Sequence, residues 1–173
     1  MLAKQLAYGA EFFKTDLRWV GIVYDFEGRV TRLSFFHDRK QDAVTAVRES
    51  LTARHRNISG VGVVREAIEK YAGGGIPDFT NVSLSPCNTD FQNRVRNACR
   101  RIGYGDTSTY GEIARSVRSP GAARAVGACM SKNLIPIIVP CHRVLGSGNR
   151  LVGFSVGPGI ALKEMLLGME RVN

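Results

Sequence analysis

The sequence predicts an α+β fold in two lobes, with strands in the first lobe and mainly helices in the second. Residues 17–36 combine apolar runs with a turn signal, as paired strands do, whereas apolar positions from about residue 88 onward recur at helical spacing. With 173 residues, 44% of them hydrophobic, the chain can bury one core or two small ones. We place the boundary where the pattern changes, which gives an N-terminal α/β lobe of residues 1–85 and a C-terminal lobe of residues 86–173.

The strands of the first lobe are expected in two consecutive segments. Residues 17–28, LRWVGIVYDFEG, are rich in apolar and β-branched side chains and end in a turn signal. Residues 29–36, RVTRLSFF, follow with partial alternation of apolar and polar side chains. Asp25 to Gly28 would form the hairpin turn between the two strands.

Two helices and an extended exit segment complete the expected first lobe. Residues 38–55 are predicted to be helical because one face of the helix would hold Ala43, Val47 and Leu51. Residues 62–75 are predicted to be helical up to a run of glycines, with one face holding Val63, Ala67 and Tyr71. Residues 76–86, IPDFTNVSLSP, read as an extended segment that leads out of the lobe.

The second lobe is predicted to begin with a helix over residues 88–105, which Thr89 or Asp90 would cap. Its apolar face would hold Phe91, Val95, Ala98 and Ile102. A last helix is expected over residues 159–170, GIALKEMLLGME.

Between them, two short helices joined by a tight turn predict a helix-turn-helix. In residues 108–119, Ser108 or Thr109 would cap the first helix, and Glu112 is placed to close a capping box on Thr109. In residues 119–133, Ser119 would be the N-cap of the second helix and Pro120 its first residue.

Charge and cysteine content limit the possible partners and compartment. The formal net charge is +9, from 24 Lys and Arg against 15 Asp and Glu. This excess fits an anionic partner, nucleic acid first, or simply a basic soluble protein. The four cysteines include no C-x-x-C pair, so zinc-ribbon spacing is absent. Neither a signal peptide nor an apolar run long enough for a membrane span is evident, so we expect free thiols in the cytoplasm.

The second helix of the helix-turn-helix has one face of small residues. Positions 123, 124, 127 and 131 share that face and hold Ala, Arg, Gly and Ser. Such a face lets a helix backbone approach a DNA groove closely, with Arg124 reaching a phosphate or the base stack. Tight packing between helices, with Arg124 in solvent, would explain the same pattern. The opposite face would be the core side, with Val126, Cys129 and Met130.

The stretch IPIIVPCHRVLG, residues 135–146, places a cysteine and a histidine after a run expected to be a buried strand. A neighbouring base or cation can convert a thiol into the nucleophilic thiolate. A triad would also need a carboxylate to orient the imidazole, for which Glu164 and Glu170 are candidates. A buried structural cysteine beside an unrelated histidine is the alternative. Arg143 is expected to be structural, bridging this segment to nearby backbone.

The order of these stretches resembles the O6-alkylguanine-DNA alkyltransferase family, the methylated-DNA–protein-cysteine methyltransferases. The resemblance covers about residues 88–170 and depends on STYGEIA, AARAVGACMSKN, IPIIVPCHRV, GFSVG and ALKEMLLGME, in that order. It implies a ribonuclease-H-like α/β first lobe and a second lobe with a winged-helix-like helix-turn-helix. The first lobe itself is similar only loosely, through GIVYDFEGRVTRLSFF.

The resemblance implies direct reversal of DNA alkylation in a single turnover, without a cofactor. Cys141 would accept the alkyl group from O6 of guanine, with O4-alkylthymine as a second candidate substrate. His142 would act as the base through a water molecule, oriented by Glu170 rather than by Glu164. Asn133 matches the hinge asparagine that ties the recognition helix to the active-site segment.

The resemblance also implies how DNA is bound. A monomer in the cytoplasm, or on the nucleoid of a prokaryote, would bind double-stranded DNA through the minor groove and flip the damaged base. Arg124 would fill the vacated stack, and the groove would be lined by Ala122, Ala123, Ala125 and Gly127. The substrate pocket would be formed by Tyr110, Pro136, Ser155 and the backbone carbonyls of Cys141 and Val144.

The sequence differs from the usual family pattern in one loop residue, in one segment and in its possible zinc ligands. Val156 stands where the family usually has glycine, and its β-branched side chain would narrow the pocket against bulky adducts. The segment before Tyr110, IGYGDTSTYG, lacks the Pro-Xaa-Gly found in many members. Some members bind zinc, but His37, His55 and Cys87 are too scattered here, so we predict no metal.

Three other functions would each account for part of the sequence. A protein that only flags alkylated DNA would lack the cysteine, which Cys141 argues against. A helix-turn-helix regulator would leave PCHRV unexplained and would need a longer polar reading face. A cysteine hydrolase would turn over repeatedly and would need an oxyanion hole, whereas alkyl transfer to sulfur has no tetrahedral intermediate.

Overall fold

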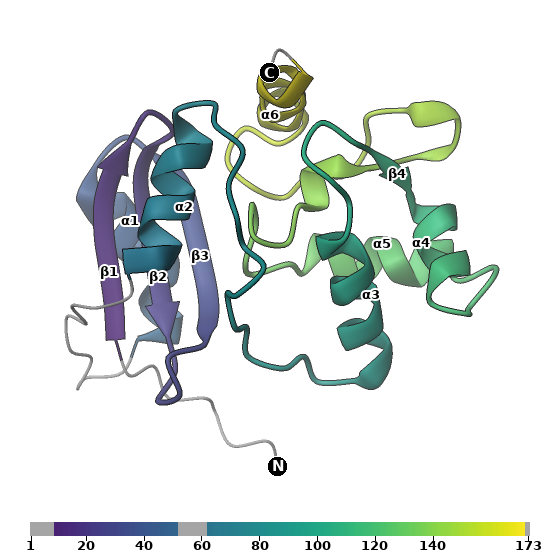
Figure 1. Cartoon of the computed structure of the whole chain (residues 1–173), viewed down its shortest axis with the longest axis horizontal. Coiled ribbons are helices and arrows are strands. Elements are labelled where there is room, and N and C mark those ends of the chain that lie inside the picture. The colour runs from purple at the N-terminus through teal and green to yellow at the C-terminus, as the bar shows by residue number, and fades with distance from the viewer. Residues whose placement is uncertain (1–8, 52–61, 172–173) are drawn as a thin grey trace. The chain divides into compact units, whose positions relative to one another are not determined.

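The computed structural model describes residues 9–51 and 62–171 (Figure 1). The chain separates into two compact units, with Ser85 the last residue of the first and Pro86 the first residue of the second. The mixture of helices and small sheets confirms the predicted α+β class.

The first unit is built on a three-stranded antiparallel sheet in the order β1–β2–β3. Its strands are β1 (Gly9–Thr15), β2 (Arg18–Tyr24) and β3 (Val30–His37). The last five residues of β2 are all buried because both faces of this central strand are covered. The sequence predicted β2 and β3, and the structure confirms them. It did not predict β1, whose burial does not alternate and whose conformation depends on pairing with β2.

The predicted turn between β2 and β3 is also confirmed. The Asp25 carboxylate accepts hydrogen bonds from the backbone N–H groups of Glu27 and Arg29, at 3.0 and 2.9 Å. Gly28 closes the turn with a φ of +72°, a conformation that glycine adopts without steric cost. The exit segment returns to this place, since Leu84 forms a parallel bridge with Val30.

Helices α1 (Lys40–Val47) and α2 (Gly62–Ala72) cover opposite faces of the sheet (Figure 1). Neighbouring residues of β1 show this, because Phe12 packs on the cluster that includes Val47 of α1, whereas Phe13 lies under the guanidinium of Arg65 in α2. The predicted face of α2 was partly wrong, since Val63 is 61% exposed. The buried face is instead set by Val64, Ala67, Ile68 and Tyr71.

The first predicted helix is shorter than expected. After Val47 the chain tightens into a 3₁₀ turn, η1 (Arg48–Ser50), and Leu51 is extended. The remaining predicted part, residues 52–55, lies outside the described residues.

The second unit packs four helices around a two-stranded parallel sheet. The helices are α3 (Asp90–Arg100), α4 (Tyr110–Ser116), α5 (Ala123–Ser131) and α6 (Ile160–Arg171). The sheet pairs β4 (Ser108–Thr109) with β5 (Val144–Leu145), and two 3₁₀ turns, η2 (Cys141–Arg143) and η3 (Ser147–Asn149), flank β5. The apolar face of α3 was partly misassigned: Val95, Ala98 and Cys99 are buried, whereas Phe91 and Ile102 are only partly buried.

Helix caps were predicted well at two positions and wrongly at a third. Thr89 caps α3, and Thr109 and Glu112 form the expected capping box at α4. Helix α5 begins at Ala123 instead of near Pro120. The chain first makes a turn in which Gly121 has a φ of +90°, and the Ser119 hydroxyl lies against the Val117 carbonyl instead of capping α5.

The apolar run before Cys141 is buried as predicted, but it is not a strand. Residues 135–139 fold into consecutive tight turns, with hydrogen bonds from Ile138 N to Pro136 O and from Val139 N to Ile135 O. Ile137 has a φ of +69°, outside the extended region in which regular strand residues lie. The Asn133 side-chain oxygen accepts the Ile135 N–H at 3.1 Å and so helps to set this turn.

Among residues 9–51 and 62–171, no helix is long and apolar enough to cross a membrane.

Candidate active site

Cys141 begins the 3₁₀ turn η2, directly after Pro140, and is 5% exposed. Its sulfur accepts a hydrogen bond from Asn133 Nδ2 at 3.1 Å, and the same Nδ2 donates to the Val139 carbonyl at 2.9 Å. Asn133 follows the end of α5, so it joins this helix to the segment that bears the thiol. All four cysteines are free thiols.

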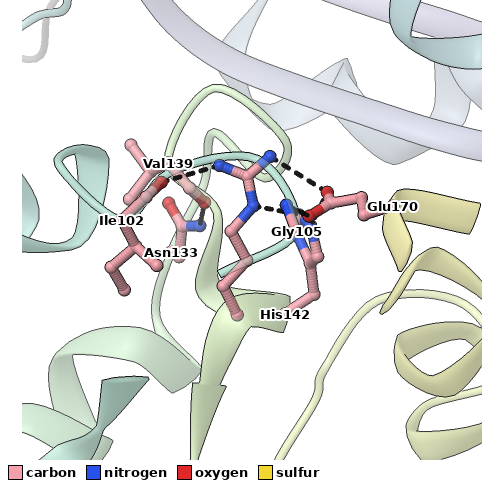
Figure 2. Close-up of polar contacts among 7 residues, drawn as sticks. Ile102, Gly105, Asn133, Val139, His142 and Glu170 are labelled. Carbon is pink, nitrogen blue, oxygen red and sulfur yellow. Dashed lines mark hydrogen bonds and ion pairs between the residues drawn. The ribbon is translucent and has the colours of Figure 1, made fainter. Parts of the chain in front are cut away.

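The buried side chains of His142, Arg143 and Glu170 form a hydrogen-bonded network (Figure 2). Glu170 Oε1 lies 2.7 Å from His142 Nε2, and both side chains are fully buried. Arg143 donates to both oxygens of Glu170, with Nε 2.8 Å from Oε2 and Nη2 3.0 Å from Oε1. Arg143 Nη1 also donates to the Ile102 carbonyl at 2.8 Å, and Gly105 N donates to Glu170 Oε2 at 3.2 Å.

The structure thus distinguishes the two carboxylates that the sequence left as candidates. Glu170 lies on the buried side of α6, whereas Glu164 on the same helix is exposed. Arg143 bridges the active-site turn to the backbone of residue 102, which is the kind of structural contact expected for it.

The network sets the protonation states of the carboxylate and the imidazole. Burial alone would raise the pKa of Glu170, but the hydrogen bonds and charges of His142 and Arg143 outweigh it and lower the pKa to about 2. Burial lowers the pKa of His142, and the hydrogen bond with Glu170 only partly opposes this shift. Near neutral pH, Glu170 is therefore ionised and His142 is neutral. A neutral imidazole whose Nε2–H donates to Glu170 carries its lone pair on Nδ1.

The thiol needs help to ionise. Burial raises the pKa of Cys141, while the Asn133 N–H, the Lys163 cation and the backbone N–H groups of Cys141 and His142 act in the opposite direction. The resting sulfur is thus a protonated thiol surrounded by groups that favour its thiolate. A neutral histidine held by an ionised glutamate is one of the arrangements that can take the proton from such a thiol, and here the histidine is the next residue in the chain.

Lys163 is a component of the site that the sequence did not indicate. Its side chain is fully buried, and Nζ donates to the carbonyls of Val144 and Val152 at 2.6 and 2.8 Å. Burial lowers the pKa of Lys163, whereas the thiols Cys141 and Cys99 oppose this shift. The helical spacing could have indicated its burial, because Lys163 and Glu170 lie seven residues apart, on the same face of α6 as its buried leucines.

The two-stranded sheet of β4 and β5 positions Tyr110 near the thiol-bearing segment. Pairing of Ser108 and Thr109 with Val144 and Leu145 places the start of α4 beside the active-site segment. A Cβ at Gly153 would lie 3.2 Å from the Tyr110 hydroxyl. Burial, followed by the nearby thiols, raises the pKa of Tyr110, so its hydroxyl remains a hydrogen-bond donor.

The other residues predicted to bind the substrate differ in their surroundings. Pro136 and Val144 are buried, Val156 is half-buried and Ser155 is exposed, with its hydroxyl 3.2 Å from the Ser131 carbonyl. The Cys141 carbonyl accepts the Val144 N–H, and the Val144 carbonyl accepts Lys163 Nζ. Each carbonyl therefore already uses one of its two lone pairs inside the protein.

Helix α5 presents the small-residue face that the sequence predicted. Val126 and Met130 are buried on its core side. Arg124 and Ala125 are exposed, whereas Ala122, Ala123 and Gly127 are half-buried. A Cβ at Gly127 would lie 3.9 Å from the Tyr110 ring, so this helix also adjoins the active site.

Within the described ranges, 9–51 and 62–171, no group of three or more His, Cys, Asp or Glu side chains could hold a metal ion. His55, which was considered with His37 and Cys87, lies outside these ranges.

The chain is similar to known proteins in sequence and in structure. Residues 90–172 match the family model of the 6-O-methylguanine DNA methyltransferase DNA-binding domain. The methylated-DNA–protein-cysteine methyltransferase of Haemophilus influenzae is 45% identical over 109 residues, 63% of this chain and 60% of that protein. The corresponding protein of Methanosarcina acetivorans is 47% identical over 103 residues and is matched over 64% of its length. The chain thus spans less than two thirds of these two relatives.

Two further similarities extend over nearly the whole chain. The structure resembles the crystal structure of Mycobacterium tuberculosis OGT in complex with DNA with a TM-score of 0.76 and 32% identity, covering 95% of this chain and 93% of that one. The constitutive methylated-DNA–protein-cysteine methyltransferase of Bacillus subtilis is 34% identical over 152 residues, 88% of this chain and 89% of its own length. With similarity reaching through both units, this chain belongs to the methylated-DNA–protein-cysteine methyltransferase family.

Proposed function

We propose that this protein repairs alkylated DNA by moving the alkyl group from O6 of guanine onto Cys141, once per molecule. The observation that carries the proposal is the buried thiol beside a neutral histidine that an ionised glutamate holds in place. An alkyl carbon on an aryl ether oxygen requires a strong, soft nucleophile, which a thiolate is. The relatives from B. subtilis and H. influenzae are named as methyltransferases that act between methylated DNA and a protein cysteine, which supports the proposal.

The proposed reaction uses only groups of the protein and of the substrate. His142 Nδ1 takes the thiol proton through a water molecule while Glu170 stabilises the imidazolium. The sulfur electron pair forms a bond to the alkyl carbon as the carbon–oxygen bond breaks, and the proton that His142 received passes on to the departing guanine and neutralises it. The product is a thioether at Cys141, which explains the single turnover and why no cofactor is needed. Asn133 stabilises the thiolate by donating to the sulfur.

The substrate pocket is proposed to lie around this thiol. Tyr110 donates from its hydroxyl, Pro136 flanks the base, and the carbonyls of Cys141 and Val144 accept from the exocyclic amine with their remaining lone pairs. Ser155 donates to the departing oxygen. Val156 limits the size of the adduct, and O4-alkylthymine is a second candidate substrate.

We propose that the damaged base reaches the pocket from double-stranded DNA bound through its minor groove. Arg124 enters the space that the flipped base leaves, and the small face of α5 follows the groove along Ala122, Ala123, Ala125 and Gly127. The exposure of Arg124 on a helix that adjoins Tyr110 supports this arrangement. The OGT of M. tuberculosis, which was crystallised with DNA, is similar over both units.

The architecture fits this function. We propose a ribonuclease-H-like topology for residues 1–85 and a winged-helix-like helix-turn-helix, formed by α4 and α5, in residues 86–173. The antiparallel order β1–β2–β3 and the packing of α4 against α5 support these assignments. The protein would act as a monomer in the cytoplasm, associated with the nucleoid in a prokaryote.

The test is transfer of label from DNA that carries O6-[methyl-³H]guanine. The wild type is expected to take up no more than one methyl group per chain, on Cys141. A Cys141→Ser variant that still takes up label, or a wild type that turns over many times, would refute the proposal.

A further inference from the structure

A pocket lined by two arginines lies beside the turn between α4 and α5. It has a volume of about 380 Å³ and is lined by Arg94, Ser116, Val117 and Arg118. Arg94 projects from α3, Ser116 ends α4, and Arg118 belongs to the turn itself. Both arginines are exposed, and no carboxylate in the described part of the chain forms an ion pair with either of them.

The backbone at Arg118 is in a conformation that favours glycine. Ser119 N donates to the Ala114 carbonyl at 2.9 Å and Arg118 N donates to the Arg115 carbonyl at 3.0 Å, the two hydrogen bonds of a Schellman helix end. Arg118, which donates the second of these hydrogen bonds, has a φ of +58°. Most residues other than glycine adopt this left-handed conformation only at a steric cost. An arginine here therefore weakens the helix end while placing a guanidinium in the pocket.

The charge of the chain is concentrated in the same unit. Residues 86–173 contain 12 of the 24 Lys and Arg but only 5 of the 15 Asp and Glu, so they hold 7 of the 9 net positive charges. Arg118 stands six residues before Arg124, on the segment that leads directly into α5. The two-arginine pocket thus flanks the start of the helix proposed to enter the minor groove.

We propose that Arg94 and Arg118 bind a backbone phosphate of the DNA duplex, outside the damaged nucleotide. This inference rests on the proposed function. Guanidinium groups match phosphate oxygens in charge and in fork-like geometry, and two of them can hold one phosphodiester from two sides. Because every nucleotide carries a phosphate, this contact positions the protein on the duplex and does not distinguish damaged from undamaged DNA.

Arg118→Gly provides a sharp test because it changes folding stability and DNA affinity in opposite directions. Glycine relieves the strained helix end, so the thermal midpoint should stay the same or rise. Affinity for an undamaged duplex should fall by roughly tenfold or more, as expected for the loss of a charge-assisted hydrogen bond. The slope of log affinity against log salt should become shallower by about 0.9, the value for one phosphate contact.

Two more variants complete the experiment. Arg94→Gln should reproduce the loss of affinity and the change in slope, and the ratio of affinities for lesion and undamaged duplexes should remain that of the wild type in both variants. Arg171→Gln is the matched control, since it removes one positive charge from an exposed position on α6 and should change affinity less than twofold.

The outcomes separate this inference from the proposed function. Binding is measured on undamaged duplex. Label transfer is measured in parallel at saturating concentrations of lesion duplex, and in that assay both pocket variants should react at the wild-type rate. Pocket variants that transfer label normally and bind with wild-type affinity and salt slope would overturn the phosphate contact alone. A pocket that binds only free phosphate would also overturn the phosphate contact. In that case the thermal midpoint of the wild type would be higher in phosphate than in chloride of equal ionic strength, while Arg118→Gly would bind DNA with wild-type affinity.

Discussion

Replacing Glu170 by glutamine should destabilise the protein strongly at neutral pH. The Glu170 carboxylate accepts four hydrogen bonds within the buried network, from His142, Arg143 and Gly105. Its pKa is lowered from 4.5 to about 2, which corresponds to about 3 kcal/mol of stability for the ionised form. Glutamine removes this contribution and leaves the charge of Arg143 buried without its counterion, a change that typically costs about 3–5 kcal/mol.

The pH dependence makes the prediction specific. Because the folded pKa of Glu170 is lowered, its stabilisation is fully present above pH 4.5 and is lost as the pH falls through 4.5 towards 2. The difference between the wild type and Glu170→Gln should therefore be largest near pH 7 and fall to less than half by pH 3.

Thermal unfolding followed by circular dichroism measures both effects. For a chain of 173 residues, a loss of 3–5 kcal/mol lowers the midpoint by roughly 10 °C. Glu164→Gln is the matched control, because Glu164 is exposed on the same helix, and it should shift the midpoint by less than about 2 °C. A Glu170→Gln protein that melts with the wild type at pH 7, or a difference that does not narrow between pH 5 and pH 3, would refute the reasoning.

Three further predictions concern the thiol, the pocket and its supporting loop. Asn133→Ala removes the donor to the sulfur, so the pKa of the thiol should rise further and the pH midpoint of single-turnover methyl transfer should move up by about one unit; an unmoved midpoint contradicts this. Val156→Gly should increase the rate with O6-benzylguanine relative to O6-methylguanine, and an unchanged rate ratio would exclude Val156 as the limit on adduct size. Gly153→Ala should lower the thermal midpoint by several degrees, because Gly153 has a φ of +57° and a Cβ there would lie 3.2 Å from the Tyr110 hydroxyl. Gly168→Ala, on an open surface of α6, is its control and should raise the midpoint slightly.

Features that depend on neighbours in the chain were predictable from the sequence. The capping box needs only Thr109 and the residue three positions later, and the hairpin turn needs only the polar residues and glycine of one short segment. The start of α5 was misplaced because Ser119 and Pro120 are equally suited to a turn and to a helix start, and Gly121 decides for the turn.

Features that depend on distant parts of the chain were harder to predict. An apolar run such as residues 135–139 is buried whether it is extended or turned, and only Asn133 together with the backbone of Ile137 distinguishes the two. Strand β1 acquires its conformation from β2. Lys163 was missed because a lysine is normally exposed, and its place in the buried register of α6 matters only once Val144 and Val152 supply carbonyls to it.

The position of α6 in the chain has a consequence for synthesis. Cys141 is made before the helix that supplies both the carboxylate and the buried cation, and Glu170 follows it by 29 residues. At about 5–20 residues per second, the growing chain carries this cysteine for about 1–6 s before its activating groups exist. A chain that stops short of α6 therefore lacks the carboxylate and the buried cation of this network, so under the proposed function it could not yet react with a lesion.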